Sequence, residues 1–175
     1  WGITHARFAA LPPRNRNLTG RRGGGLCGVE NLEAAIRPVR KLFDHSRVSI
    51  GSINGGLLKL ADAQPLNRVS GGVHAAGFVH AGGILVREDF GRHNALDKLV
   101  GALERSCVGA GCLVITSRAS YEIGHKAAAA GIAIVVAISA PTDLAIRLAM
   151  EAGVTLVAFA RGQTMTVYTH ADRLY

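Results

Sequence analysis

The sequence predicts an α/β fold in three layers, in which helices cover both faces of a mostly parallel, mixed β-sheet. Short, continuous apolar segments such as "CLVIT" (residues 112–116) and "IAIVVAI" (residues 132–138) are typical of strands buried on both faces. These segments alternate with amphipathic segments of helical period, which is the pattern of a parallel sheet covered by helices. The 175 residues, 49% of them hydrophobic, are enough for one main domain.

The first third of the chain is the least regular part. Residues 1–28 carry no sustained hydrophobic period and are predicted to form a loop rich in glycine and arginine. Residues 29–37 place their apolar side chains along one helical face, so a helix is expected there until Pro38 ends it. A weaker helix is predicted over residues 49–63, where two adjacent glycines interrupt the pattern. The α/β domain is therefore expected to span residues 29–175.

From residue 70 onward the periodicity is cleaner, and glycines mark the ends of elements. Gly131 and Gly153 are expected just after helices, and Pro141 is expected in the first turn of one. The expected elements are, in order, a hairpin of strands over 73–80 and 83–89, a helix over 92–106, a strand over 112–116, a helix over 119–131, a strand over 132–138, a helix over 141–153, and strands over 154–159 and 163–169.

Charge and composition narrow the classes of function. The formal net charge is +8, and residues 1–28 contain five arginines and no acidic residue. This local charge, with only 5% aromatic residues, disfavours a nucleic-acid-binding protein. An odd number of cysteines, three, predicts a reducing cytoplasm, and the lack of an apolar run of about 18 residues predicts no membrane span. The chain starts "WGITHARF", without Met, so we expect it to extend further upstream.

Polar residues follow the predicted strands, where ligands bind in open parallel sheets. Two of three strand-end loops carry an arginine: residues 117–120 contain Arg118, and residues 160–163 contain Arg161. The third loop, residues 139–142, is chemically quieter. Arginines, hydroxyls and free amides at one sheet edge favour a phosphate-bearing ligand. The alternative is that the serines cap helices and the arginines are merely solvated.

The polar cluster "EDFGRHNALDKLVG" (residues 88–101) lies at a strand-to-helix junction. His93 by itself is more consistent with capping or packing than with binding, but the position of the whole cluster favours a site. A zinc deaminase is disfavoured, because the residue two after His74 is Ala76 rather than glutamate and no Cys-x-x-Cys occurs. Cys107 and Cys112 are expected to be buried hydrophobic side chains.

Cys27 has a different setting, because cations precede it and a predicted helix follows it. Both features lower the pKa of a thiol and favour the reactive thiolate. A glycine-rich tether would let the sulfur reach a second molecule. The alternative is a loop cysteine without a chemical role.

Five stretches together resemble the FdhD/NarQ family of formate dehydrogenase accessory sulfurtransferases: "LTGRRGGGLCGVE", "GGVHAAGF", "EDFGRHNALDKLVG", "ITSRASYEI" and "LVAFARGQTMTVYTH". The stretches run in order from Leu18 to His170, and the resemblance extends to about Leu174, nearly the whole chain. The resemblance implies a cytidine-deaminase-like α/β/α fold, a homodimer, and a family N-terminal region that this chain lacks. It also implies that sulfur passes from a cysteine desulfurase, as a cysteine persulfide, to the bis-molybdopterin guanine dinucleotide molybdenum cofactor, which then serves formate dehydrogenase.

The resemblance assigns candidate site residues. Cys27 is the candidate persulfide carrier. The family's cofactor-binding segment corresponds to Phe159, Ala160, Arg161, Gly162, Gln163 and Thr164, and a guanine nucleotide is expected to mimic the cofactor there. On the physical argument above, Arg92, His93, Ser117 and Arg118 are further candidates for contacts to phosphate or pterin, and no resident metal is predicted.

Gly24 departs from the family pattern. Family members usually have Cys-x-x-Cys in this loop, and Gly24 occupies the position of the first cysteine, to which the persulfide is usually assigned. Three readings follow: Cys27 alone carries the sulfur, the residue has been substituted, or this member has lost the chemistry. The alternative function is therefore a cofactor chaperone that binds its cargo without covalent chemistry.

Overall fold

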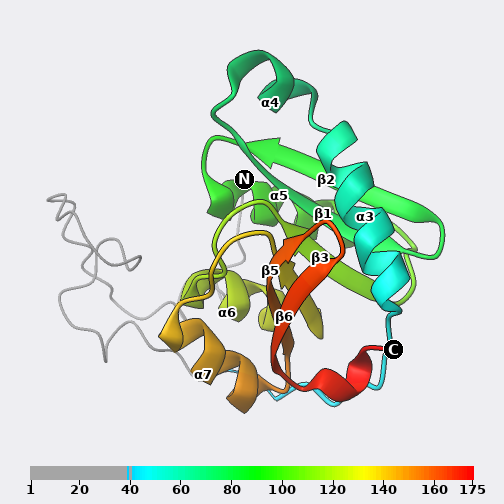
Figure 1. Cartoon of the computed structure of the whole chain (residues 1–175), viewed down its shortest axis with the longest axis vertical. Helices are drawn as coiled ribbons and strands as arrows, with labels where there is room; N and C mark the ends of the chain where they lie inside the picture. Colours follow the sequence, from blue (N-terminus) through cyan, green and yellow to red (C-terminus); the bar gives the residue numbers. More distant parts are fainter. Residues whose placement is uncertain (1–38, 40) are drawn as a thin grey trace, which may run out of the picture. The chain divides into compact units, whose positions relative to one another are not determined.

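The computed structural model describes residue 39 and residues 41–175 (Figure 1). The predicted loop over residues 1–28, with Cys27, and the predicted helix over residues 29–37 lie outside the described residues. Val39–Tyr175 form one unit, in which a six-stranded sheet packs against helices. The predicted α/β class is confirmed.

The sheet has the strand order β2-β1-β3-β4-β5-β6. Its strands are β1 (His74–His80), β2 (Gly83–Asp89), β3 (Gly111–Ile115), β4 (Ile134–Ala137), β5 (Thr155–Arg161) and β6 (Thr164–Thr169). The strand positions agree with the predicted ones to within a few residues, and β5 runs two residues beyond its predicted end.

The sheet is mixed, with a parallel centre and a hairpin on each side. β3, β4 and β5 pair in parallel, whereas β1 is antiparallel to both β2 and β3, and β6 is antiparallel to β5. Four strands, β2, β3, β4 and β5, therefore point the same way, but only two of the five pairs of neighbouring strands are parallel. The expectation of a mostly parallel sheet holds for the direction of the strands and is wrong for the pairing of neighbours. Connections of two residues, Ala81–Gly82 and Gly162–Gln163, can join only antiparallel strands.

Helices form the two outer layers. They are α3 (Ile50–Asp62), α4 (Pro65–Ser70), α5 (Arg92–Leu103), α6 (Tyr121–Ala129) and α7 (Asp143–Ala152), and a 3-10 helix, η1 (Ala171–Arg173), precedes the last residues. Alternate residues of β3 face opposite layers: Leu113 and Ile115 pack with α5, α6 and α7, whereas Cys112 and Val114 pack with α3. The predicted three layers are confirmed, with α3 on one side of the sheet (Figure 1).

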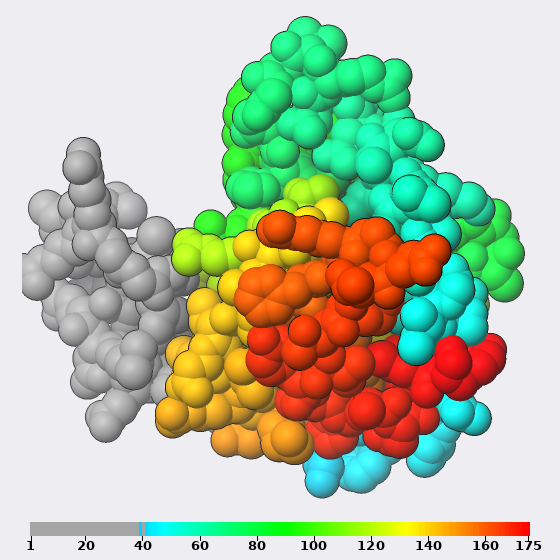
Figure 2. Space-filling model, viewed as in Figure 1, coloured from blue at the N-terminus to red at the C-terminus, as the bar shows by residue number. Residues whose placement is uncertain are grey.

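The helix layer on the α3 side is incomplete. Three of the six residues of β6 are exposed and only one is buried, and Figure 2 shows the strand, in orange-red, uncovered at the centre of the view. Two details of the prediction were wrong. α4 was not anticipated, and α7 begins at Asp143 rather than around Pro141. Thr142 caps α7 by accepting a hydrogen bond from the Ala145 N–H (3.2 Å), while Pro141 forms a β-bridge with Ala119.

The glycine pair that weakened the helical pattern of α3 is explained by its packing on β1. A Cβ on Gly56 would overlap the side chain of Val79, whereas a Cβ on Gly55 would meet nothing within 4 Å. We expect Gly56→Ala to destabilise the protein by about 1–3 kcal/mol through overpacking. Gly55→Ala, the matched control, should stabilise it by about 0.5–1 kcal/mol through helix propensity. Urea unfolding of both variants measures the difference, and equal effects would contradict this packing.

Candidate functional site

Four strands end at one edge of the sheet, which we call the carboxyl edge. It comprises the ends of β2, β3, β4 and β5, because these strands point the same way. The three predicted strand-end loops follow β3, β4 and β5, and α5 begins directly after β2. The structure therefore brings to one edge the polar cluster of residues 88–101 and the two arginine-bearing loops.

Hydrogen bonds join the three loops to one another. The Ala119 N–H donates to the Ala140 carbonyl at 3.2 Å, which links the loops after β3 and β4. The Phe159 N–H donates to the Ser139 carbonyl at 3.3 Å. The Arg161 Nε–H donates to the carbonyl of Ile138, the residue directly after β4, at 3.2 Å. The loops thus form one continuous surface that can present several donors to a single ligand.

The segment from Phe159 to Thr164 has an unusual backbone. Phe159 has a φ of 52°, which a non-glycine residue rarely adopts, and its side chain is 44% exposed. The register between β5 and β6 shifts between Ala158 and Arg161, so the bulge re-aims the side chains there. Only Gly162 and Gln163 form the turn, since β5 extends to Arg161. Strained backbone of this kind often occurs where a ligand is bound.

Asp89 fixes the junction between β2 and α5. Its carboxylate accepts hydrogen bonds from the Gly91 N–H (2.9 Å) and the Asn94 side chain (3.2 Å), and Lys98 lies 2.5 Å from it. The hydrogen bond from Lys98, then those from Gly91 and Asn94, lower the pKa of Asp89 to about 2. Asp89 therefore carries a negative charge that holds the first turn of α5 in place.

This pKa predicts a pH-dependent contribution to stability. Because the pKa of Asp89 is lower in the folded state than in the unfolded chain, the contribution is present above about pH 4 and is lost as the pH falls through about 2. Asp89→Asn should therefore lower the Tm at about pH 6, and its Tm should meet that of the wild type below about pH 2. Asp62→Asn, at the exposed end of α3, is the control. A Tm difference that does not change with pH would contradict this role.

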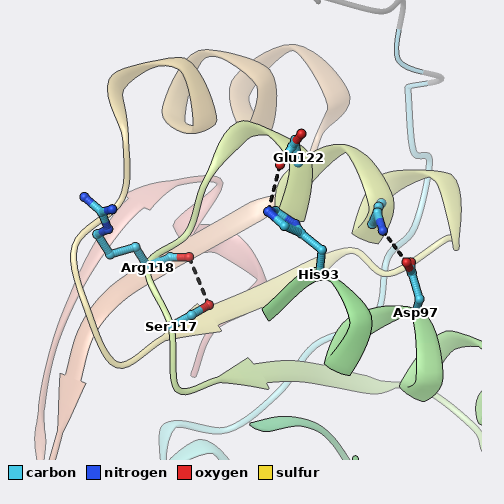
Figure 3. A network of polar contacts seen from close by, with 6 residues as sticks. His93, Asp97, Ser117, Arg118 and Glu122 are labelled. Carbon is cyan, nitrogen blue, oxygen red and sulfur yellow. Dashed lines mark hydrogen bonds and ion pairs between the residues drawn. The ribbon is translucent and has the colours of Figure 1, made fainter. Parts of the chain in front are cut away.

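His93 and Glu122 join the first turns of α5 and α6. Figure 3 shows the two side chains pointing toward each other, and His93 Nε2 lies 2.8 Å from Glu122 Oε2. Burial lowers the pKa of His93 and outweighs the opposing effect of Glu122, while Arg92 and Lys126 lower it further and Asp97 raises it. His93 is therefore neutral at neutral pH, with the proton on Nε2 donated to Glu122 and a lone pair on Nδ1.

Unsatisfied polar atoms occur at the N-termini of both α5 and α6. Within the described residues, four buried side-chain polar atoms lack a hydrogen-bond partner, and three of them belong to Arg92 (Nε), His93 (Nδ1) and Ser120 (Oγ). Buried polar groups in native proteins are nearly always hydrogen-bonded, so a group of exceptions indicates a site for a ligand. The sequence did not single out Glu122, because its pairing with His93 arises only from the packing of α6 on α5.

Other candidates lie apart from this group. Figure 3 shows the Arg118 side chain extending away from the His93–Glu122 pair, and Ser117 Oγ donates to the Arg118 carbonyl (3.2 Å). Ala76 is buried within β1, packed with the α5–α7 layer. Among residue 39 and residues 41–175, no three His, Cys, Asp or Glu side chains lie together as a metal site.

The two cysteines in the described part differ. Cys112 is fully buried, as predicted, and burial raises the pKa of its thiol to about 12. The expectation that Cys107 is buried was wrong. Cys107 is exposed, because α5 ends at Leu103 and the chain then crosses the surface to β3.

A cavity of about 340 Å³ lies at the opposite edge of the sheet. It is lined by Asp44 and Glu104, among others, and by residues that precede or begin β3 and β4, such as Gly111 and Ile132. The polar cluster and the arginine-bearing loops are at the carboxyl edge instead. We therefore place the candidate site at the carboxyl edge.

Comparison with known sequences identifies the family of the chain. A sequence model of the FdhD/NarQ family matches residues 3–175, nearly the whole chain. The chain belongs to the FdhD/NarQ family. Five separate motifs predicted this membership, and it is confirmed.

The relatives carry names that describe sulfur transfer. A protein of Xanthomonas campestris pv. campestris named "Sulfur carrier protein FdhD" is 52% identical over 176 residues, covering 98% of this chain and 63% of the relative. A protein of the same name from Variovorax paradoxus is 47% identical over the same shares. The chain thus spans less than two thirds of the length of these FdhD/NarQ proteins.

A solved structure shares the fold. A putative formate dehydrogenase accessory protein from Desulfotalea psychrophila superimposes with a TM-score of 0.73 at 27% identity, covering 78% of this chain and 60% of that one. None of the described helices of this FdhD/NarQ chain combines the length and the apolar character that a membrane span requires.

Proposed function

We propose that this chain is a cytoplasmic sulfur carrier that takes sulfur as a persulfide on Cys27 and delivers it to the bis-molybdopterin guanine dinucleotide molybdenum cofactor. A cysteine desulfurase is the donor, and formate dehydrogenase receives the sulfurated cofactor. The names of the relatives, sulfur carrier and formate dehydrogenase accessory protein, support the general role. A homodimer stays a prediction.

The observation that carries the proposal is that Arg161 and Arg92 lie at the same carboxyl edge of the sheet. Arg161 and the segment around it meet the loop after β4, and Arg92 begins α5 at the same edge. Guanidinium groups and helix N-termini bind the phosphates of a nucleotide. The molybdenum cofactor is cargo here, and its guanosine diphosphate portion is the part that these residues fit.

The covalent step requires only a thiolate. The Cys27 thiolate attacks the outer sulfur of the donor's cysteine persulfide, a new sulfur–sulfur bond forms on Cys27, and the donor's cysteine leaves as a thiolate. Oxidation states balance between the two cysteines, so no external oxidant is needed. Five arginines precede Cys27 in the sequence, and cations of this kind lower the pKa of a nearby thiol.

A second candidate is a cofactor chaperone without covalent chemistry. Gly24, at the position where the family usually has the first cysteine, favours it. Incubation with a cysteine desulfurase and cysteine, followed by intact-mass measurement, separates the two. The sulfur carrier gains the mass of one sulfur atom that a reductant removes. A chaperone binds guanosine diphosphate equally well but gains no mass.

A further inference from the structure

The N-terminus of α5 is electrostatically unusual. Its first turn contains Arg92 and His93 and no acidic residue. The N-terminus of a helix already carries a partial positive charge, so basic groups there are unfavourable unless an anion compensates them. Because His93 contacts Glu122, the N-terminus of α6 lies next to this turn.

Ser120 supplies an independent indication of a ligand. It occupies the N-cap position of α6, where a serine hydroxyl normally accepts a backbone hydrogen bond, yet its side chain makes no such bond. Ser120 is only 6% exposed, and its Oγ has no partner within the described residues. Arg92 Nε, a second buried donor, also lacks a partner there.

We propose that Arg92, His93 and Ser120 form an anion site between the N-termini of α5 and α6, and that His93 takes up one proton as a phosphate-type oxyanion binds. Arg92 Nε–H and the Ser120 hydroxyl donate to the oxyanion directly. His93 can donate from Nδ1 only when it is protonated, because Glu122 already holds the proton on Nε2. Glu122 is a positioning residue that stabilises the imidazolium without touching the anion.

This inference rests on the proposed function, since the oxyanion would be the diphosphate of the guanine nucleotide. It deepens that function in two ways. It places the phosphates against α5 and α6, with the rest of the nucleotide towards Phe159–Thr164. It also adds Ser120 and Glu122 to the residues that act at the carboxyl edge. The proton comes from solvent and remains on His93 while the anion is bound.

The direction of the pH dependence follows from the groups that face His93. In the free protein, burial, Arg92 and Lys126 keep the pKa of His93 low, against Glu122 and Asp97. A bound anion beside Nδ1 raises that pKa. At a pH between the pKa of His93 in the free protein and its pKa in the anion-bound protein, binding takes up a proton. The affinity for the anion should therefore increase as the pH falls.

Calorimetric titration with sulfate and with guanosine diphosphate tests the proposal. Sulfate does not titrate near neutral pH, so any proton uptake belongs to the protein. We expect close to one proton taken up per anion, seen as a dependence of the measured heat on the ionisation enthalpy of the buffer. In nitrogen NMR spectra the His93 ring, assigned by comparison with His93→Gln, should change from one protonated nitrogen to two. Guanosine, which has no phosphate, should cause neither change.

Two variants with matched controls complete the test. Glu122→Gln and Ser120→Ala should each weaken the binding of guanosine diphosphate by about tenfold, and Glu122→Gln should also reduce the proton uptake. Glu104→Gln and Ser106→Ala, beyond the other end of α5, should leave both quantities unchanged. Circular dichroism and Tm values of all four variants separate loss of the site from loss of the fold.

The outcomes distinguish this inference from the proposed function. Binding of guanosine diphosphate without proton uptake and without an effect of Glu122→Gln overturns the anion site and leaves the sulfur carrier intact. Proton-coupled binding by a chain that never gains sulfur supports the anion site and overturns the sulfur carrier. The absence of any binding of sulfate or nucleotide overturns the anion site.

Discussion

Cys27→Ala should abolish sulfur loading and reduce the activation of formate dehydrogenase to the level found without the protein. Removal of the only nucleophile in a relay leaves no group to hold the sulfur, so we expect a loss of at least about a hundredfold rather than a partial effect. The measurements are the mass of the chain after incubation with a desulfurase and cysteine, and formate dehydrogenase activity in cells that carry each variant.

Cys107→Ser is the matched control for this experiment. Cys107 is the exposed cysteine of the described part and is accessible from solvent, whereas Cys112 is buried and its thiol has a raised pKa. Cys107→Ser should keep full sulfur transfer. If sulfur appears on Cys107, or if Cys27→Ala still supports formate dehydrogenase, the assignment of Cys27 is wrong.

Arg161→Ala should weaken the binding of guanosine diphosphate by about 10- to 100-fold. Arg161 lies at the end of β5, and its Nε–H bonds to the carbonyl of Ile138, which leaves the rest of the guanidinium to donate to the nucleotide beside Phe159–Thr164. A hydrogen bond from a charged donor contributes about 1.5–3 kcal/mol, which corresponds to that loss of affinity. Calorimetric titration of the variant measures it.

Arg147→Ala is the control for Arg161→Ala. Arg147 is an exposed arginine on α7, paired with Asp143 one turn earlier, and its substitution removes the same charge elsewhere on the chain. The affinity of the Arg147→Ala variant for the nucleotide should stay within about twofold of the wild type, as expected for a surface pair. Equal losses in the two variants would indicate a general effect of net charge rather than a contact at the carboxyl edge.

The sequence was sufficient to predict the elements of the fold because their signals are local. Continuous apolar runs identified β3 and β4, and glycines marked the ends of helices, as Gly153 does after α7. The pairing of the strands was harder. Whether β1 pairs with β2 alone or also with β3 depends on contacts between residues that are far apart in the sequence. Because β1 pairs antiparallel with both, the sheet has fewer parallel pairs than expected.

The candidate site was predicted only in part, for a related reason. Arg92, His93 and Arg161 were found because their positions at strand ends can be read along the chain. Glu122 was missed, because nothing in the spacing of "ASYEI" shows that the side chain reaches His93 on another helix. The strained φ of Phe159 was also not predictable, since only the bulge between β5 and β6 requires it.

A crystal of the protein soaked with guanosine diphosphate would show where the nucleotide binds. We expect density for it at the carboxyl edge, with the phosphates between the N-termini of α5 and α6 and the base near Phe159–Thr164. Density in the cavity beside Asp44 and Glu104, at the other edge of the sheet, would contradict it.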